Sequence, residues 1–173
     1  MEVPEDWRAG AAFTWFPSPA FPTRGKAGGG RTFGDRFMSK TVVTGLVAIH
    51  LAASLWHGGA HTQLAIGLPI EKTIFVYVVI LIAPIAAAAL VWTRYLSIGL
   101  WVFFLSMLGA LLFGAYHHYV LVSPDNIGHL PAGSPESHSQ FIASAAVIAL
   151  LELASALYGA YCLGSRRAQQ AHA

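Results

Sequence analysis

Four long apolar runs dominate the sequence, and short polar or charged segments separate them. They cover about residues 41–62, 72–93, 95–122 and 140–164. Each is near or above the roughly 20 residues that a helix needs to cross a hydrocarbon core of about 30 Å. A chain in lipid must satisfy its own backbone hydrogen bonds, so these runs are expected to be helical. The pattern predicts an all-α integral membrane four-helix bundle over residues 41–165.

The second run contains a proline, Pro84, within the segment LIAPIAAAAL. A proline inside a helix removes one backbone donor and crowds the preceding turn. We therefore expect the second helix to be kinked near this residue.

Three histidines interrupt the first run at His50, His57 and His61, which are offsets of i, i+7 and i+11. At about 100° per residue, the second and third return to within roughly 20° of the first, so all three share one helix face. The opposite face is apolar. A polar stripe within a membrane-length helix is costly, and its default interpretation is a functional one.

The fourth run contains Glu152, the single acidic residue within the four apolar runs. A carboxylate near the middle of the membrane costs several kcal/mol unless it is neutralised or paired. His50 lies at a similar depth in the first run, so a contact between these two side chains would satisfy both. The sequence leaves open whether such a pair is a structural contact between helices or a proton relay to a nearby site.

The composition agrees with a membrane protein, since 55% of the residues are hydrophobic and 10% are charged. A soluble domain has about 25% charged residues. Cys162 is the single cysteine, which excludes a disulfide framework or an iron–sulfur cluster built by one chain. The basic residues gather at the ends of the apolar runs, where they set topology, so we expect no nucleic-acid partner.

The distribution of lysine and arginine predicts the orientation. Six of the ten basic residues lie in the first forty residues, and Arg94, Arg166 and Arg167 fall on the same side of a four-helix arrangement. Lys72 alone lies opposite. Positive residues favour the cytoplasmic side. We expect both termini in the cytoplasm and a bacterial inner (plasma) membrane location. A signal peptide cleaved after Ala60 is a competing interpretation.

Residues 1–40 form an N-terminal arm with four prolines, a glycine triplet and many aromatic side chains. This composition predicts irregular structure. The arm is either a mobile tail with aromatics at the membrane interface or an extended segment that docks on a partner or on the inner end of the bundle. Met38 is an alternative natural start. Residues 166–173 are expected to form a short cytoplasmic tail.

Six of the eight histidines are predicted to lie near the outer face of the membrane. They are His57, His61, His117, His118, His129 and His138. The sequence therefore predicts an outer histidine cluster, with the oxygen ligands Asp125 and Glu136 nearby. Adjacent helical residues point about 100° apart, so His117 and His118 are not expected to bind one ion together, and His118 is favoured to face the bundle.

Imidazole ligands suit copper, zinc or iron, and all six outer histidines are candidate metal ligands. A b-type haem is the other candidate cofactor. It needs axial histidines on facing helices, from His57 or His61 on one side and His117 or His118 on the other. The alternative is that these histidines bond only to water, lipid headgroups or helix-end carbonyls.

Three classes of function follow from these features, without a reaction or a substrate. The first is a small membrane protein that uses a metal or haem for redox or electron-transfer work. The second is a non-catalytic accessory subunit that docks on a larger membrane complex through its arm and helix faces. The third and weakest is a transporter that uses His50 and Glu152. Besides the lipid bilayer, a protein partner or a second copy of the chain is expected.

Overall fold

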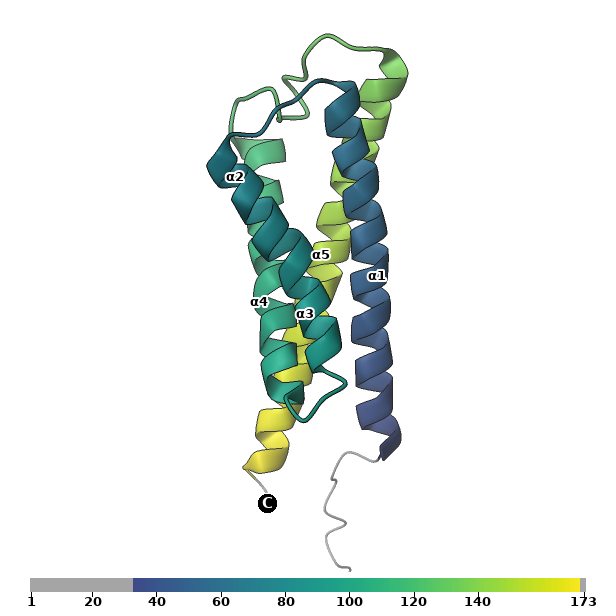
Figure 1. Cartoon of the computed structure of the whole chain (residues 1–173), viewed down its shortest axis with the longest axis vertical. Coiled ribbons are helices and arrows are strands. Elements are labelled where there is room, and N and C mark those ends of the chain that lie inside the picture. Colours follow the sequence, from purple (N-terminus) through teal and green to yellow (C-terminus); the bar gives the residue numbers. More distant parts are fainter. Residues whose placement is uncertain (1–32, 172–173) are drawn as a thin grey trace, which may run out of the picture.

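The computed structural model describes residues 33–171, which form helices and no strand. Figure 1 shows these helices side by side as the rods of a bundle, which confirms the predicted all-α architecture. The two π-helical segments, η1 and η2, are wider turns within the second and third rods. In chain order, the elements are α1 (Phe33–Gln63), α2 (Ile70–Phe75), η1 (Val76–Ile82), α3 (Ala83–Leu90), α4 (Leu96–Ala115), η2 (Tyr116–Val120) and α5 (Pro135–Gln170).

Four helical segments of the described chain are long and apolar enough to cross a membrane, which confirms the four predicted runs. They are Lys40–Gln63, Ile70–Leu90, Leu96–Val120 and Pro135–Ala168. The first and last helices are longer than predicted, since α1 begins at Phe33 and α5 runs from Pro135 to Gln170. Proline fits the first turn of a helix, so Pro135 begins α5 rather than stopping it. Residues 33–40 of the arm are helical, whereas residues 1–32 lie outside the described residues.

Near Pro84, where the sequence predicts a kink, the second span contains the π-helical segment η1. The N–H of Ala83, just before the proline, bonds to the carbonyl of Val78, five residues back. Proline has no N–H and its ring needs space in the preceding turn, and a wider turn supplies that space. The second span therefore continues as α3 to Leu90 without a break.

The third rod also ends in a wider turn, and the following loop folds back over it. The N–H of Leu121 donates to the carbonyl of Tyr116 at 2.8 Å, five residues back. The N–H of Ile127 then donates to the carbonyl of His118 at 3.0 Å. These bonds hold the loop after η2 against the end of the helix, close to the side chain of His118.

One end of the bundle, here called the apolar end, is filled by hydrophobic side chains. There α5 packs along α1 and α4, and α3 packs on α4. A Cβ added at Gly99 in the first turn of α4 would lie 2.8 Å from the backbone nitrogen of Val91, so the close approach of α4 to the end of α3 needs glycine. The buried residues of this core are Val43, Val47, Ala87, Val91, Leu100, Phe103, Met107, Ala156, Cys162 and Leu163.

The opposite end, here called the histidine end, is more open. α1 meets the second span mainly at α3, and Figure 1 shows α1 and α2 diverging above it. A small apolar cluster of Ala60, Leu64 and Phe141 lies at this end. The start of α1 and the end of α5 both lie at the apolar end (Figure 1), as the four-span arrangement requires. Which end faces the cytoplasm stays a prediction.

Candidate metal centre

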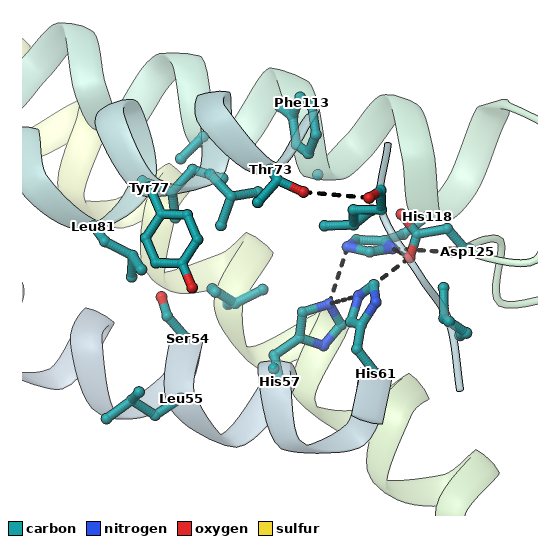
Figure 2. Close-up of a pocket in the computed structure, with 18 of the residues that line it drawn as sticks. Ser54, Leu55, His57, His61, Thr73, Tyr77, Leu81, Phe113, His118 and Asp125 are labelled. Carbon is teal, nitrogen blue, oxygen red and sulfur yellow. Dashed lines mark hydrogen bonds and ion pairs between the residues drawn. The ribbon is translucent and has the colours of Figure 1, made fainter. Parts of the chain in front are cut away.

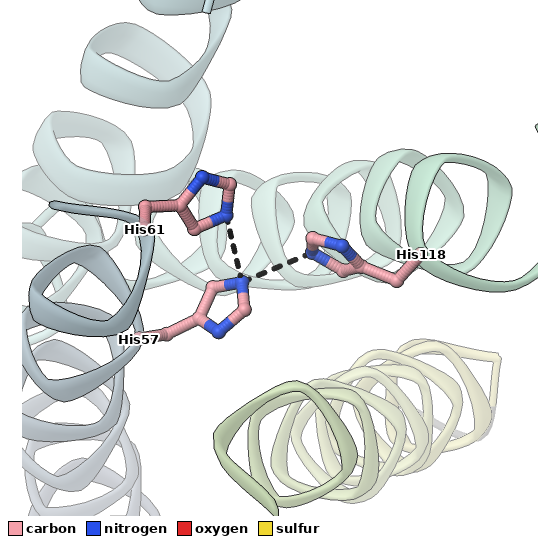
Figure 3. A group of neighbouring side chains, drawn as sticks. All are labelled: His57, His61 and His118. Carbon is pink, nitrogen blue, oxygen red and sulfur yellow. Dashed lines mark hydrogen bonds between the residues drawn. The ribbon is translucent and has the colours of Figure 1, made fainter. Parts of the chain in front are cut away.

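Three histidines converge at the histidine end, and Figure 3 shows their rings pointing at one another. His57 and His61 lie one turn apart on α1, and His118 comes from η2 on the facing rod. The Nε2 atoms of His57 and His118 are 3.1 Å apart, and those of His57 and His61 are 3.2 Å apart. One ring nitrogen from each histidine lies within 4.8 Å of the other two.

These separations match those between ligands of a single metal ion. Imidazole nitrogens bind zinc at about 2.0–2.1 Å, so two of them in a tetrahedral site lie about 3.3–3.4 Å apart. The observed separations of 3.1 and 3.2 Å are close to this spacing. His57 of the first span and His118 of the third span thus lie close enough together for one metal ion to contact both rings.

The hydrogen-bond partner of His57 sets which ring nitrogen carries its proton. Its Nδ1 lies 2.9 Å from the hydroxyl of Ser144 on α5. That hydroxyl donates its own proton to the carbonyl of Phe141 at 3.1 Å, so its oxygen accepts the Nδ1–H of His57. A neutral His57 ring thus presents the lone pair of Nε2 to the other two histidines.

His118 is oriented in the same way by Asp125. Its Nδ1–H donates to the backbone carbonyl of Asp125 at 2.9 Å, which leaves a lone pair on Nε2. The carboxylate oxygen Oδ1 of Asp125 lies 3.2 Å from Nδ1 of His118 and 3.2 Å from Nε2 of His61. A carboxylate or carbonyl behind a histidine is the usual outer support of a metal ligand.

When both rings are neutral with their protons on Nδ1, the lone pairs of His57 and His118 face each other across 3.1 Å. Two acceptors at this distance repel unless a cation lies between them, and a metal ion satisfies both at once. His61 differs from the other two, because its Nδ1 is buried without a hydrogen-bond partner among the described residues.

Asp125 places a negative charge beside the three imidazoles. Burial raises the pKa of its carboxyl, but the interaction with His118 and the charges of His118, His61 and His57 outweigh burial and hold the pKa below its usual value. The loop keeps this side chain in place, since Asn126 donates to the carbonyl of Leu121 at 3.1 Å. A carboxylate at this position offsets part of the charge of a bound cation.

His50 and Glu152 lie deeper in the bundle, and the contact expected from their similar depth is confirmed. Nε2–H of His50 donates to Oε1 of Glu152 at 3.2 Å, and the two residues are 0% and 2% exposed. The other carboxylate oxygen lies near Gly114, where an added Cβ would approach it to 3.8 Å. Glu152 also lines the pocket described next. Its role as a proton relay stays a prediction.

A pocket of about 540 Å³ lies beside the three histidines. Figure 2 shows the imidazoles and Asp125 at one end, and Leu55, Tyr77 and Leu81 at the other. Most of its remaining wall is apolar. The other residues that line it are Ser54, Gly58, Gly59, Ile66, Leu68, Thr73, Val76, Ile80, Ala110, Phe113, Gly114, Ile148 and Glu152.

The structure does not bring three of the predicted ligands into this group. His117 lies next to His118 on the helix but points elsewhere, and its Nδ1–H donates to the carbonyl of Phe113 at 2.9 Å. Nδ1 of His129 lies 3.3 Å from the side-chain oxygen of Asn126. Nε2–H of His138 donates to the carbonyl of Pro131 at 2.9 Å. Each of these rings bonds to its own helix or loop.

The main residue that sequence reasoning missed is Ser144. A lone serine in an apolar helix has no pattern that marks it as the partner of a distant histidine. Asp125 was expected only as a nearby oxygen ligand, because the bend of the loop over His118 is not visible in the sequence. Glu136, the other acid considered, is exposed and lies outside the group.

The described chain thus combines four helical segments long and apolar enough to cross a membrane with three histidines close enough together to hold a metal ion. Comparison with protein-family models, with curated proteins and with solved structures finds no match to this chain. The function is therefore argued from the geometry of the site alone.

Proposed function

We propose that this chain is an integral membrane metalloprotein in which His57, His61 and His118 hold one divalent transition-metal ion. The observation that carries the proposal is the convergence of three Nε2 atoms from two facing helices. Ser144 and the carbonyl of Asp125 engage the Nδ1 atoms of His57 and His118, so both Nε2 lone pairs are free for an ion. This preorganisation would be unexplained if the rings only bonded to one another.

Three protein ligands leave a coordination position open, which is the arrangement of catalytic rather than structural zinc sites. The pocket adjoins the imidazoles and gives a small molecule access to that position. A bound ion would act as a Lewis acid or, if it is copper or iron, would also exchange electrons. The redox role predicted from the sequence thus depends on the identity of the ion.

The spacing favours a single ion over the b-type haem that the sequence also suggested. Two axial nitrogens on opposite sides of a haem iron are about 4 Å apart, twice a metal–nitrogen bond of about 2.0 Å. Here the Nε2 atoms of His57 and His118 are 3.1 Å apart, and a third imidazole lies on the same site. A porphyrin ring would have to enter between imidazoles that already touch.

Elemental analysis of the full chain purified in detergent tests the proposal. After equilibration with zinc, copper or iron, we expect one ion per chain, and His57→Ala and His118→Ala should each lose it. His117→Ala is the matched control, because His117 is equally buried and adjacent to His118 but lies outside the group. Absence of every metal, or full retention in both variants, would overturn the proposal. A Soret band in the absorption spectrum would show that the site binds haem instead of a single metal ion.

The location is proposed to be a bacterial inner membrane with both termini in the cytoplasm, which puts the metal centre at the outer face. The support is the positive-inside distribution of lysine and arginine. In a Cys162→Ala background, Ser134→Cys should react with an impermeant thiol reagent from outside, and Ala168→Cys should not. The reverse labelling pattern would place the centre on the cytoplasmic side.

The alternative function, an accessory subunit of a larger complex, stays a prediction. The N-terminal arm on which it mainly depends lies largely outside the described residues. Stoichiometric co-purification of another chain with a metal-free protein would favour this alternative over a metalloprotein.

A further inference from the structure

The pocket runs from the metal ligands to the surface of the bundle between α1 and η1. Figure 2 shows the histidines at its inner end, and Ser54 and Tyr77 facing each other farther along it. Its back wall is buried, since Ile80 is 8% exposed and Ala110 is 1% exposed. The imidazoles and Asp125 lie at the inner end, and most of the remaining wall is apolar.

The outer end of the pocket is open. Leu55 on α1 is 74% exposed and Tyr77 on η1 is 57% exposed, although both line the pocket. Gly58 lies beside them on α1, and a Cβ added there would meet no atom within 4 Å. The two helices therefore form the rims of an opening, and glycine keeps one rim free of a side chain.

This opening lies at the depth of the hydrocarbon core. At 1.5 Å per residue, Leu55 is about 12 Å from the end of its span at Gln63, and Leu81 is about 16 Å from the start of its span at Ile70. Both positions are well inside a hydrocarbon core of about 30 Å. In a membrane, a side chain exposed at this depth faces acyl chains rather than water.

From these features we infer that the metal centre takes a bilayer-soluble aliphatic molecule, which enters sideways from the lipid and presents a small polar group to the ion. The inference rests on the proposed function and adds the class of ligand. Such a molecule places its hydrocarbon part against the apolar wall and its polar end at the open coordination position. A water-soluble polar substrate would have to cross the hydrocarbon to reach the same opening.

A series of n-alkyl hydroxamates tests the inference, because the hydroxamate group binds transition metals while the alkyl chain varies. The full chain in lipid nanodiscs is loaded with Co²⁺, and binding is followed in the cobalt absorption spectrum against the free aqueous probe concentration. Affinity should rise about fourfold per methylene from acetohydroxamate to octanohydroxamate, as each methylene leaves water. An affinity independent of chain length would overturn the inference.

Variants separate entry into the pocket from simple partitioning of long probes into lipid, which is the same for every variant. Gly58→Leu should fill the opening, so octanohydroxamate loses about tenfold or more in affinity while acetohydroxamate binds as before. Gly45→Leu is the matched control, because Gly45 is also exposed on α1 with nothing within 4 Å of an added Cβ but is remote from the pocket. Equal effects of the two substitutions would overturn the inference.

A second pair of variants tests the pocket without a substitution next to the proposed ligand His57. Leu81→Trp narrows the pocket from the η1 side, and Ile82→Trp adds the same bulk at a residue that is 57% exposed and does not line the pocket. Only Leu81→Trp should weaken octanohydroxamate. Failure of the unmodified chain to bind Co²⁺ would reject the metal centre and the inference together, whereas Co²⁺ binding with a flat chain-length series would reject the inference alone.

Discussion

The two ends of the bundle are built from the same four rods but in opposite ways. At the apolar end, large side chains such as Phe103 and Met107 are completely buried, and glycines let backbones approach closely. At the histidine end, α1 and η1 leave a pocket between them, and its lining includes the polar side chains of His57, His61, His118, Asp125 and Glu152. The apolar end thus holds the helices together, and the histidine end contains the candidate metal ligands.

This division has a physical reason. A site that admits a ligand needs unfilled space and unsatisfied polar atoms, and both reduce stability. Close packing at the apolar end supplies the rigidity that keeps His57 on α1 and His118 on η2 at the right separation. We therefore expect substitutions at the apolar end to change the free energy of unfolding, and substitutions at the histidine end to change metal affinity instead.

The largest effect is expected from a cavity at the apolar end. Phe103→Ala should reduce the free energy of unfolding by about 3–5 kcal/mol, because it removes a completely buried aromatic ring. Thermal or denaturant unfolding in detergent measures this change. Leu105→Ala is the control on the same helix; Leu105 is 56% exposed, and its loss should change stability by about 0.5 kcal/mol or less. Similar changes for both residues would contradict the proposed division.

The next effect concerns the carboxylate behind the ligands. Asp125→Asn removes the negative charge near His118 and His61, and metal affinity should fall by about 10–100-fold, as is usual for such supporting residues. Competition with a chelator of known affinity measures the change. An unchanged metal affinity would show that the backbone carbonyl of Asp125 alone orients His118.

Ser144→Ala should have a smaller effect of the same kind. His57 loses the acceptor for its Nδ1–H, and we expect metal affinity to fall by about tenfold, since the lost partner is neutral. Ser155→Ala is the matched control. Ser155 is a completely buried serine on the same helix, but its hydroxyl has no hydrogen-bond partner among the described residues. Competition with the chelator should give a lower metal affinity for Ser144→Ala than for Ser155→Ala. Equal affinities of the two variants would show that Ser144 does not support the metal site.

The smallest effect on stability is expected at the boundary between the two ends. Glu152→Leu deprives His50 of its partner, and contacts of this kind between membrane helices average about 0.6 kcal/mol. Glu152→Gln keeps an acceptor for His50 and should be nearly neutral in the unfolding measurement. A proton relay would also require that Glu152→Gln abolish the activity of the metal centre while its metal content is unchanged. Normal activity in that variant would leave only a structural contact.

Much of the fold could be predicted from the sequence, because it depends on local patterns. Apolar length defines the four spans, and the spacing of His50, His57 and His61 correctly places them on one inward face. The pair of His50 and Glu152 could be predicted from depth alone. These inferences need only the pitch of a helix and the thickness of a membrane.

The rest of the site depends on contacts that no local pattern encodes. That His118 belongs to the histidine group could be predicted from the smaller residues on its helix face. That His129 and His138 lie outside this group depends on how the loop after η2 bends, which the sequence does not show. The role of Ser144 depends on the rotation of α5 relative to α1. The widened turns η1 and η2 also escape a search for regular helical periodicity.

The π-helical turn η2 has a consequence for insertions and deletions. His117 lies beside His118 but outside the metal group, so its deletion removes no proposed ligand. Deletion of His117 would nevertheless rotate the imidazole of His118 by about 100° around the helix axis. That ring would then point in the direction of the present His117 ring, which faces Phe113. A chain shorter by this one residue would keep four apolar spans of membrane length and lose the metal centre. Among homologous sequences, the length of this turn would therefore be a stricter marker of function than the presence of a histidine near it.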